Sequence, residues 1–119
     1  TNQGLCALAF TVHMSLLGEN GFRDLARLNH EVACKTADAL TAIDGVELET
    51  DTFFNEFTLT LPKPAKEVVE TLAAKGIIAG YAPRGEGDEN KLIVCATEIT
   101  QDSDIETFTS ELKTILKEG

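Results

Sequence analysis

The chain has 119 residues, a formal net charge of −10, 25% charged residues and 43% apolar residues. This length fits a single domain with a core of its own, and the balance of charged and apolar residues is that of a globular protein. The acidic excess argues against nucleic acid or an anionic membrane as the main partner, because both are bound by clusters of lysine and arginine.

The first predicted element is a helix from about Gly4 to Leu17 that ends at Gly18. It is apolar almost all the way round, since only three residues from position 5 to position 17 are polar. The run is too short to span a bilayer, and it lacks the basic flank of a signal peptide. We therefore expect a helix that protein covers on more than one side.

A turn at Glu19-Asn20-Gly21 is expected to lead into a second helix that begins at Phe22. Apolar and small residues recur in it at steps of three and four, while charged residues lie mostly off that stripe. This pattern is typical of a half-buried amphipathic helix. The residues of the stripe are Leu25, Ala26, Val32, Ala33, Thr36, Ala37 and Leu40.

Two strands follow the second helix. A turn at Asp44-Gly45 leads into a short strand, Val46 to Glu49, and the segment "FFNEFTLTL" then alternates between apolar and polar residues up to Pro62. Alternation with a period of two predicts a strand with one buried face. The residues expected on that face are Phe53, Phe57, Leu59 and Leu61.

Helix and strand continue to alternate in the second half of the chain. A helix that begins near Pro64 is expected to end at Gly76, followed by the strand "IIAGYA" and the acidic loop 83–90. The segment "KLIVCA" is continuously apolar, which indicates a central strand. Thr100 is expected to cap the last helix, whose predicted buried face comprises Ile105, Phe108, Leu112, Ile115 and Leu116.

The order of the elements is α-α-β-β-α-β-β-α. Short connections and right-handed crossovers place the "KLIVCA" strand between "EFTLTL" and "IIAGYA", antiparallel to both. The Val46 strand then joins the free side of "EFTLTL". The predicted fold class is α+β, with a mainly antiparallel four-stranded sheet and the helices packed on one face.

The sequence contains no complete catalytic or metal site. His13 and His30 have no cysteine or acid at ligand spacing and are interpreted as structural. No serine or cysteine lies on a strand-turn-helix elbow beside a plausible base, so no nucleophile–base pair is indicated and we name no catalytic, cofactor-binding or metal-binding residue. Cys6, Cys34 and Cys95 are odd in number and set among apolar neighbours, which predicts reduced, buried thiols of an intracellular protein.

Three stretches resemble one protein family in residue identity as well as in pattern. The stretch "TNQGLCALAFTVHMSLLGENGFRDLARLNHEVA" resembles the alpha subunit (subunit 1) of glycine dehydrogenase (decarboxylating), the P-protein of the glycine cleavage system. The stretches "FFNEFTLTLPKPAKEVVETLAAKGI" and "LIVCATEITQDSDIETF" are similar to the same family, and the three together cover nearly the whole chain. The chain departs from the family between Ala79 and Lys91, where its loop is shorter and acidic.

The resemblance implies part of a pyridoxal-phosphate (PLP) enzyme with the aspartate-aminotransferase-like fold, fold type I. The similar region falls on the C-terminal small domain and on the helix that enters it from the large domain. We therefore expect residues 1–18 to be the interdomain helix and residues 19–119 the small domain. A fragment that begins within its parent would also explain why the chain has no initiator methionine.

The resemblance also implies the chemistry of a bacterial-type, cytoplasmic parent complex. That complex decarboxylates glycine and transfers the aminomethyl group to the lipoyl group of H-protein, with PLP as the electron sink. In the two-subunit form of the family, the beta subunit (subunit 2) carries the cofactor lysine, so no cofactor is expected on this fragment. Consistently, its seven lysines lie on amphipathic faces or at loop edges: Lys35, Lys63, Lys66, Lys75, Lys91, Lys113 and Lys117.

The expected role of the fragment in the parent complex is structural: it packs against its own large domain and helps to shape the interface with the beta subunit. Thr1, Asn2 and Gln3 lie nearest the large domain and are candidates for a polar contribution near the active site and subunit interface. An ordinary helix start, with Asn2 or Thr1 as the cap, is the alternative for these residues.

Without its large domain, the first helix is expected to have one face that lacks a partner. Contiguous apolar surface of that size favours association, so we expect an isolated fragment to form a two-fold homodimer with Phe10 near the axis. The residues of this self-association face are Cys6, Phe10, Met14 and Leu17.

A function of a different class stays open. Small split β-α-β domains also serve as free-standing ligand-binding or regulatory modules, and fold alone does not decide function. Such a module should have a polar-lined pocket and a self-sufficient surface, whereas this chain begins with a helix that one sheet cannot cover. A stand-alone decarboxylase is a weaker third interpretation, because the cofactor lysine and a phosphate-binding loop are absent.

Overall fold

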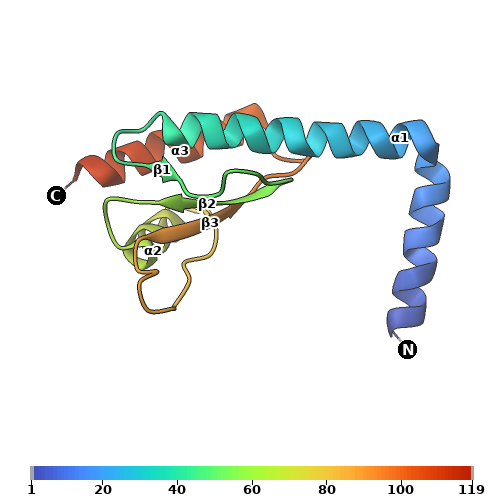
Figure 1. The fold of residues 1–119 in the computed structure, drawn as a ribbon, viewed down its shortest axis with the longest axis horizontal. Coiled ribbons are helices and arrows are strands. Elements are labelled where there is room, and N and C mark those ends of the chain that lie inside the picture. The colour runs from blue at the N-terminus through green and yellow to red at the C-terminus, as the bar shows by residue number, and fades with distance from the viewer. Residues whose placement is uncertain (1, 119) are drawn as a thin grey trace.

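A single long helix sets the shape of the molecule. In the computed structural model, which describes residues 2–118, helix α1 runs from Asn2 to Thr41 and bends at Gly18. Its first part stands away from the rest of the chain, so the molecule has the outline of a letter L (Figure 1). We call residues 2–17 the arm and residues 19–41 the second limb of α1.

The bend in α1 has a local cause. Gly18 has φ 69° and ψ −180°, outside the helical region, and glycine reaches positive φ without strain because it has no Cβ. The helix break predicted at Gly18 is confirmed. The predicted turn at Glu19-Asn20-Gly21 is wrong, because these residues are helical and one glycine is enough to redirect the chain.

The sheet is antiparallel and consists of β1 (Glu47–Leu48), β2 (Glu56–Thr60) and β3 (Lys91–Cys95), in the order β1-β2-β3. In the central pair, Phe57 lies opposite Val94 and Leu59 lies opposite Leu92. All four side chains are buried, and the residues between them are not. The predicted central pairing of "EFTLTL" with "KLIVCA", and the short strand on the free side of "EFTLTL", are confirmed.

The predicted fourth strand, "IIAGYA", is wrong in its extent. Only Tyr81 pairs with the sheet, through two backbone hydrogen bonds with Ile93 of 2.9 and 2.8 Å. The Ile77 amide instead donates to the Leu72 carbonyl of α2 (Ala65–Ala74). This hydrogen bond holds the start of the segment at the end of the helix, and the segment first pairs with the sheet at Tyr81. At Gly80 it passes so close to β3 that a Cβ would lie 2.1 Å from the Ile93 carbonyl oxygen. Within residues 2–118, the sheet therefore has three strands and one isolated bridge.

The second limb of α1 shares one hydrophobic core with α2 (Ala65–Ala74) and α3 (Asp102–Lys117). The core includes one face of β2 and β3 only, so the three helices pack on one face of the sheet, as predicted. The helical members of the core are Ala37, Leu40, Ala65, Val68, Leu72, Leu112 and Ile115.

The amphipathic patterns of α1 and α3 are confirmed. The buried residues of α1 lie between Asn29 and Leu40, all in the second limb. In α3, the predicted face is buried or packs partly against the core. The N-cap of α3 is Gln101 in a capping box with Asp104, and not Thr100 as predicted. No helix within residues 2–118 has both the length and the apolar character needed to cross a membrane.

Candidate functional site

The arm has the most exposed apolar surface of the described chain. It carries no lysine, arginine, aspartate or glutamate, so its surface offers neighbours apolar side chains and few charges. Met14 and Leu17 near the bend are half-buried, but the other five of its large apolar side chains are half or more exposed. Their exposed fractions are 67% for Leu5, 59% for Leu8, 65% for Phe10, 50% for Val12 and 83% for Leu16.

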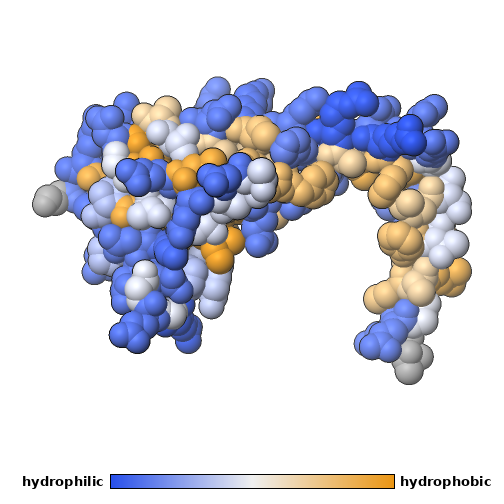
Figure 2. All heavy atoms as spheres, viewed as in Figure 1, coloured by the Kyte–Doolittle hydropathy of each residue, from blue (hydrophilic) through white to orange (hydrophobic). Residues whose placement is uncertain are grey.

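The expectation that protein covers this helix on more than one side is not met within the described chain, because both faces are open. Hydrophobic residues gather mainly on the inner side of the L, and this surface continues along the underside of the second limb (Figure 2). Charged residues begin only beyond the bend, with exposed ion pairs between Glu19 and Arg23 (3.0 Å) and between Asp24 and Arg27 (3.8 Å). The arm and the start of the second limb thus form a concave apolar surface.

The candidate interface residues from the sequence all lie on the arm. Cys6 and Phe10 are exposed and Met14 and Leu17 are half-buried. Their spacing of four, four and three residues places them along one side of the helix. Asn2 and Gln3 are exposed at the free tip of the arm, and Thr1 lies outside the described residues.

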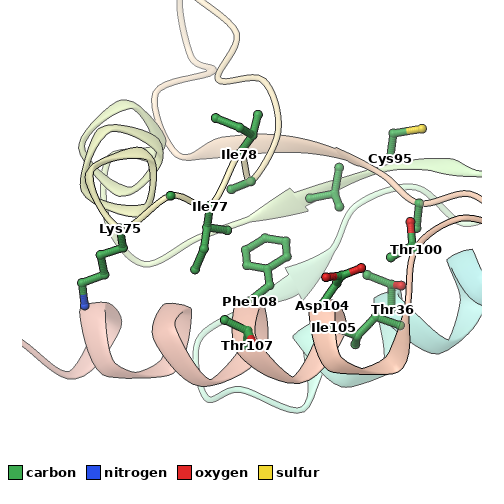
Figure 3. Close-up of a pocket in the computed structure, with 14 residues that line it drawn as sticks. Thr36, Lys75, Ile77, Ile78, Cys95, Thr100, Asp104, Ile105, Thr107 and Phe108 are labelled. Atoms are coloured by element: carbon green, nitrogen blue, oxygen red, sulfur yellow. The ribbon is translucent and has the colours of Figure 1, made fainter.

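A pocket of about 460 Å³ opens where the fourth strand is missing (Figure 3). One wall is the segment 77–79, the opposite wall is the end of β3 with Ala96, and the floor includes Ile105 and Phe108 of α3. The polar side chains around it are those of Lys75, Asp104, Thr36, Thr100 and Thr107, together with the thiol of Cys95.

Four of the polar side chains around this pocket, those of Lys75, Asp104, Thr36 and Thr100, already have partners within the chain. Lys75 Nζ lies 2.5 Å from Glu111 Oε2, and Asp104 accepts the Gln101 amide at 2.9 Å. The hydroxyl group of Thr36 donates to the Val32 carbonyl, and that of Thr100 accepts the Thr97 amide. Groups that are satisfied in this way leave few free donors or acceptors for a ligand. The pocket therefore does not favour the alternative of a free-standing ligand-binding module.

A lysine that holds PLP covalently must be able to lose its proton, which burial or a nearby cation favours. Lys75 and Lys91 have the opposite surroundings. The hydrogen bond to Glu111 raises the pKa of Lys75 above its ordinary value of 10.5. Hydrogen bonds to Glu49 and then Asp88 raise the pKa of Lys91 in the same direction. Both ammonium groups are held in the charged form.

The other lysines of the described chain do not fit covalent attachment of a cofactor either. Lys35 Nζ lies 2.5 Å from Asp102 Oδ1 at the start of α3. Lys63 donates to the backbone carbonyl groups of Ile115 and Glu118 near the end of α3. The remaining three, Lys66, Lys113 and Lys117, are exposed on helices.

One pair of titratable side chains escaped the sequence analysis. His30 and Cys34 lie one turn apart in α1, with 3.5 Å between His30 Nε2 and Cys34 Sγ, and Nδ1 of the same ring lies 2.8 Å from the Phe54 carbonyl oxygen. The pattern of a strand-turn-helix elbow does not apply to two residues within one helix, so it gave no sign of this contact. The spacing of four residues within a predicted helix was a signal, because such residues are neighbours on the helix surface.

The remaining histidine and cysteines are scattered. Cys6 and Cys95 are exposed and Cys34 is half-buried, so the predicted burial of all three is wrong, because apolar neighbours in sequence do not determine which way a side chain points. All three thiols are free. His13 is exposed on the arm. Within residues 2–118, no group of three or more His, Cys, Asp and Glu side chains has an arrangement that could hold a metal ion.

The sequence comparisons agree on one family. The profile of the family described as "Glycine cleavage system P-protein" matches residues 1–112. A "Probable glycine dehydrogenase (decarboxylating) subunit 1" from Xanthobacter autotrophicus is 53% identical over 121 residues, which cover 98% of this chain and 27% of the relative. Its counterpart in Caulobacter sp. (strain K31) is 54% identical over 98% of this chain and 26% of its own length. The chain thus spans about a quarter of these relatives.

The solved structures agree with the sequences. The chain is similar to a crystal structure of glycine decarboxylase (P-protein) of the glycine cleavage system in inhibitor-bound form, with a TM-score of 0.86, 33% identity, and coverage of 97% of this chain and 26% of that one. A C-DES mutant with glycine covalently linked to its PLP cofactor shares the fold alone, with a TM-score of 0.64, 15% identity, and coverage of 76% and 24%. The fold is that of a segment of the fold type I PLP enzymes. The chain belongs to the family of the glycine cleavage system P-protein.

Proposed function

We propose that this chain is the small domain, with its connecting helix, of a PLP-dependent subunit that decarboxylates glycine. Residues 1–18 are the interdomain helix and residues 19–119 are the small domain. The observation that carries this proposal is the arm, of whose seven large apolar side chains five are half or more exposed while the rest of the chain has its own core.

The arm is built to be covered by a large partner domain. Burying its large apolar side chains would contribute on the order of 5–10 kcal/mol, which is comparable with the stability of a whole domain. A single helix of this length is also only marginally stable in water without packing. The apolar inner side of the L suits a body that contacts the arm and the second limb together (Figure 2).

In the assembled enzyme, the role of this chain is structural. It packs on the large domain and helps to shape the interface with subunit 2, which carries the cofactor lysine. This division of roles is supported by the lysines of this chain, which are ion-paired, bonded to carbonyl groups or exposed. Thr1, Asn2 and Gln3 contribute polar groups near the active site and that interface.

The proposed reaction is the one for which the relatives are named. PLP, when bound, supplies an electron sink for the carbanion that decarboxylation leaves, and the aminomethyl group passes to the lipoyl group of H-protein. The complex works in the cytoplasm. A chain without the large domain would instead pair its arm with a second copy through Cys6, Phe10, Met14 and Leu17, as a two-fold dimer.

A chimera tests this proposal. The segment of the Xanthobacter autotrophicus subunit 1 that corresponds to this chain is replaced by this chain, and the product is combined with subunit 2, PLP and lipoyl H-protein. The assay measures carbon dioxide released from glycine. We expect an active chimera, because 53% identity over the segment preserves the core and the arm.

The matched control is the same chimera with Leu8→Glu and Phe10→Glu, which places two charges on the arm. This control should fail to assemble with its large domain and should be inactive. The proposal is contradicted if the first chimera folds and binds subunit 2 but releases no carbon dioxide, or if the charged arm leaves assembly and activity unchanged.

A further inference from the structure

A groove of about 690 Å³ lies between α2 and the loop 80–89, and the proposed function does not use it. Both walls of the groove lie away from the arm (Figure 1). Val69, Ala82 and Pro83 are half-buried and form an apolar floor. Tyr81 is 59% exposed, so its side chain is available to a partner although its backbone is held in the bridge to β3.

The groove is preformed, because its two walls are fastened to each other and to the sheet. The Ala65 amide donates to the Glu89 carbonyl at 2.8 Å, which links the start of α2 to the end of the loop. Within the loop, the Asp88 amide donates to the Gly85 carbonyl at 3.1 Å. The Asp88 carboxylate also lies 3.1 Å from Nζ of Lys91 in β3. A partner that binds here therefore loses little free energy in ordering the groove.

Carboxylates outnumber cationic groups around the groove, and all of these charged residues are exposed at its rim. Nζ of Lys66 lies 4.0 Å from Oε1 of Glu70. Within residues 2–118, no cationic side chain forms an ion pair with Glu67 or Glu86. The rim therefore attracts cations, and the net charge of −10 acts in the same direction. The carboxylates are those of Glu67, Glu70, Glu86 and Glu89, and the cationic groups are those of Lys66 and Arg84.

We propose that this groove is a docking site for a partner protein, and that it takes a segment of that protein that carries lysine or arginine. An apolar floor below an acidic rim matches these two side chains, because each has an apolar stem and a charged end. The stem packs on the floor, and the charged end lies beside the carboxylates of Glu67 and Glu86. A cation is also attracted to the face of an aromatic ring such as that of Tyr81. The floor also takes apolar side chains that flank the cation, which favours a protein segment over a small polyamine.

Tyr81 makes the test specific to this groove. It is the only tyrosine of the chain, which has no tryptophan, so the intrinsic fluorescence reports on this position. The full 119-residue chain is titrated with acetyl-Leu-Arg-Ala-Arg-Leu-amide, and calorimetry gives the Kd. We expect saturable binding that changes the tyrosine fluorescence, and a Kd about tenfold weaker for the peptide in which glutamine replaces both arginines. The absence of saturable binding, binding that leaves the fluorescence unchanged, or equal binding of the two peptides overturns the proposal.

Two pairs of substitutions separate the groove from the overall charge. Glu67→Gln with Glu86→Gln should weaken binding of the arginine peptide by about tenfold. Glu31→Gln with Glu106→Gln removes the same charge at exposed positions of α1 and α3 outside the groove, and should leave the Kd unaltered. Equal weakening by both pairs overturns the proposal, because the net charge and not the groove would then attract the peptide. Spermine that binds as tightly as the peptide overturns it in favour of a small polycation.

Discussion

Among single residues, the paired apolar side chains of β2 and β3 are buried members of the core. Leu59 is fully buried and Val94 is 2% exposed, and both belong to the one core that the three helices share with the sheet. The alternation of apolar and polar residues in "FFNEFTLTL" predicted the burial of Leu59, because a strand with one buried face can bury only every second side chain. The burial of Val94 was predicted from the continuously apolar segment "KLIVCA".

Truncating either residue tests the core directly. Leu59→Ala, or Val94→Ala, should lower the free energy of unfolding by about 2–4 kcal/mol, because each leaves a cavity in a shared core. Urea denaturation followed by circular dichroism measures the loss. Leu48→Ala, at a position 38% exposed in β1, is the control and should cost less than about 1 kcal/mol. A similar cost at Leu48 and Leu59 would contradict the assigned core.

The ion pairs of Lys91 make the stability of the fold depend on pH. Its Nζ lies 3.0 Å from Glu49 and 3.1 Å from Asp88, and these bonds raise its pKa above 10.5 in the folded chain. Because the pKa of Lys91 is raised, its ion pairs stabilise the fold fully when the pH is below the pKa of this lysine in the unfolded chain. This contribution is lost as the pH rises through the pKa of Lys91 in the folded chain.

The Lys91→Met variant should therefore melt below the unmodified chain at about pH 9, and the difference in Tm should shrink towards about pH 12. Lys66→Met is the control, since Lys66 is 83% exposed and its nearest acid is 4.0 Å away. It should show a small difference in Tm that does not change over this range. A constant Tm difference for Lys91→Met would show that its ion pairs do not contribute.

The side chains that the sequence misplaced are those whose direction depends on tertiary contacts. Cys6 and Cys95 have apolar neighbours in sequence but point outwards, one from a helix that nothing covers and one from the open end of β3. The contact between His30 and Cys34 was within reach of helical spacing. The hydrogen bond between His30 and the Phe54 carbonyl could not be predicted in this way, because Phe54 lies in a loop 24 residues further along the chain.

Among the helices and strands, the bend in α1 and the missing fourth strand show how single glycines act. At Gly18 a single positive φ redirects a helix of 40 residues. At Gly80 the chain passes so close to the Ile93 carbonyl that no side chain would fit. Sequence predicted that Gly18 interrupts the helix. The lost pairing at "IIAGYA" depends on the hydrogen bond from Ile77 back to Leu72, which no pattern of apolar residues encodes.

Gly18→Ala tests the bend. Alanine at φ 69° is strained, and a straight helix relieves that strain because the arm has no contacts that oppose it. A straight helix of 40 residues would be about 60 Å long, compared with a longest extent of 51 Å for the bent molecule.

Small-angle X-ray scattering should therefore show a larger maximum dimension for Gly18→Ala than for the unmodified chain. Gly4→Ala, in the helical part of the arm, is the control and should leave the dimension unaltered. An unchanged dimension in Gly18→Ala would mean that other contacts hold the bend.

For the molecule as a whole, we propose that the apolar arm determines how it associates. In solution, the free chain is expected to pair through Phe10 and its neighbours on the same side of the helix. Phe10→Glu should give monomers by light scattering without unfolding the domain, because the core lies entirely outside the arm. Ser15→Glu places a charge on the opposite side and should leave dimers. A chain that is already monomeric at high concentration would refute this pairing.

The central claim is that the arm is an interdomain helix covered by the large domain. The most direct test is hydrogen exchange of the backbone amides of residues 2–17, in the monomeric chain at high dilution and in the active chimera with the Xanthobacter autotrophicus subunit. An uncovered helix opens readily, and a packed one opens only with its domain. We predict exchange in the chimera that is slower by about 100-fold or more. Equally fast exchange in both would contradict the assignment.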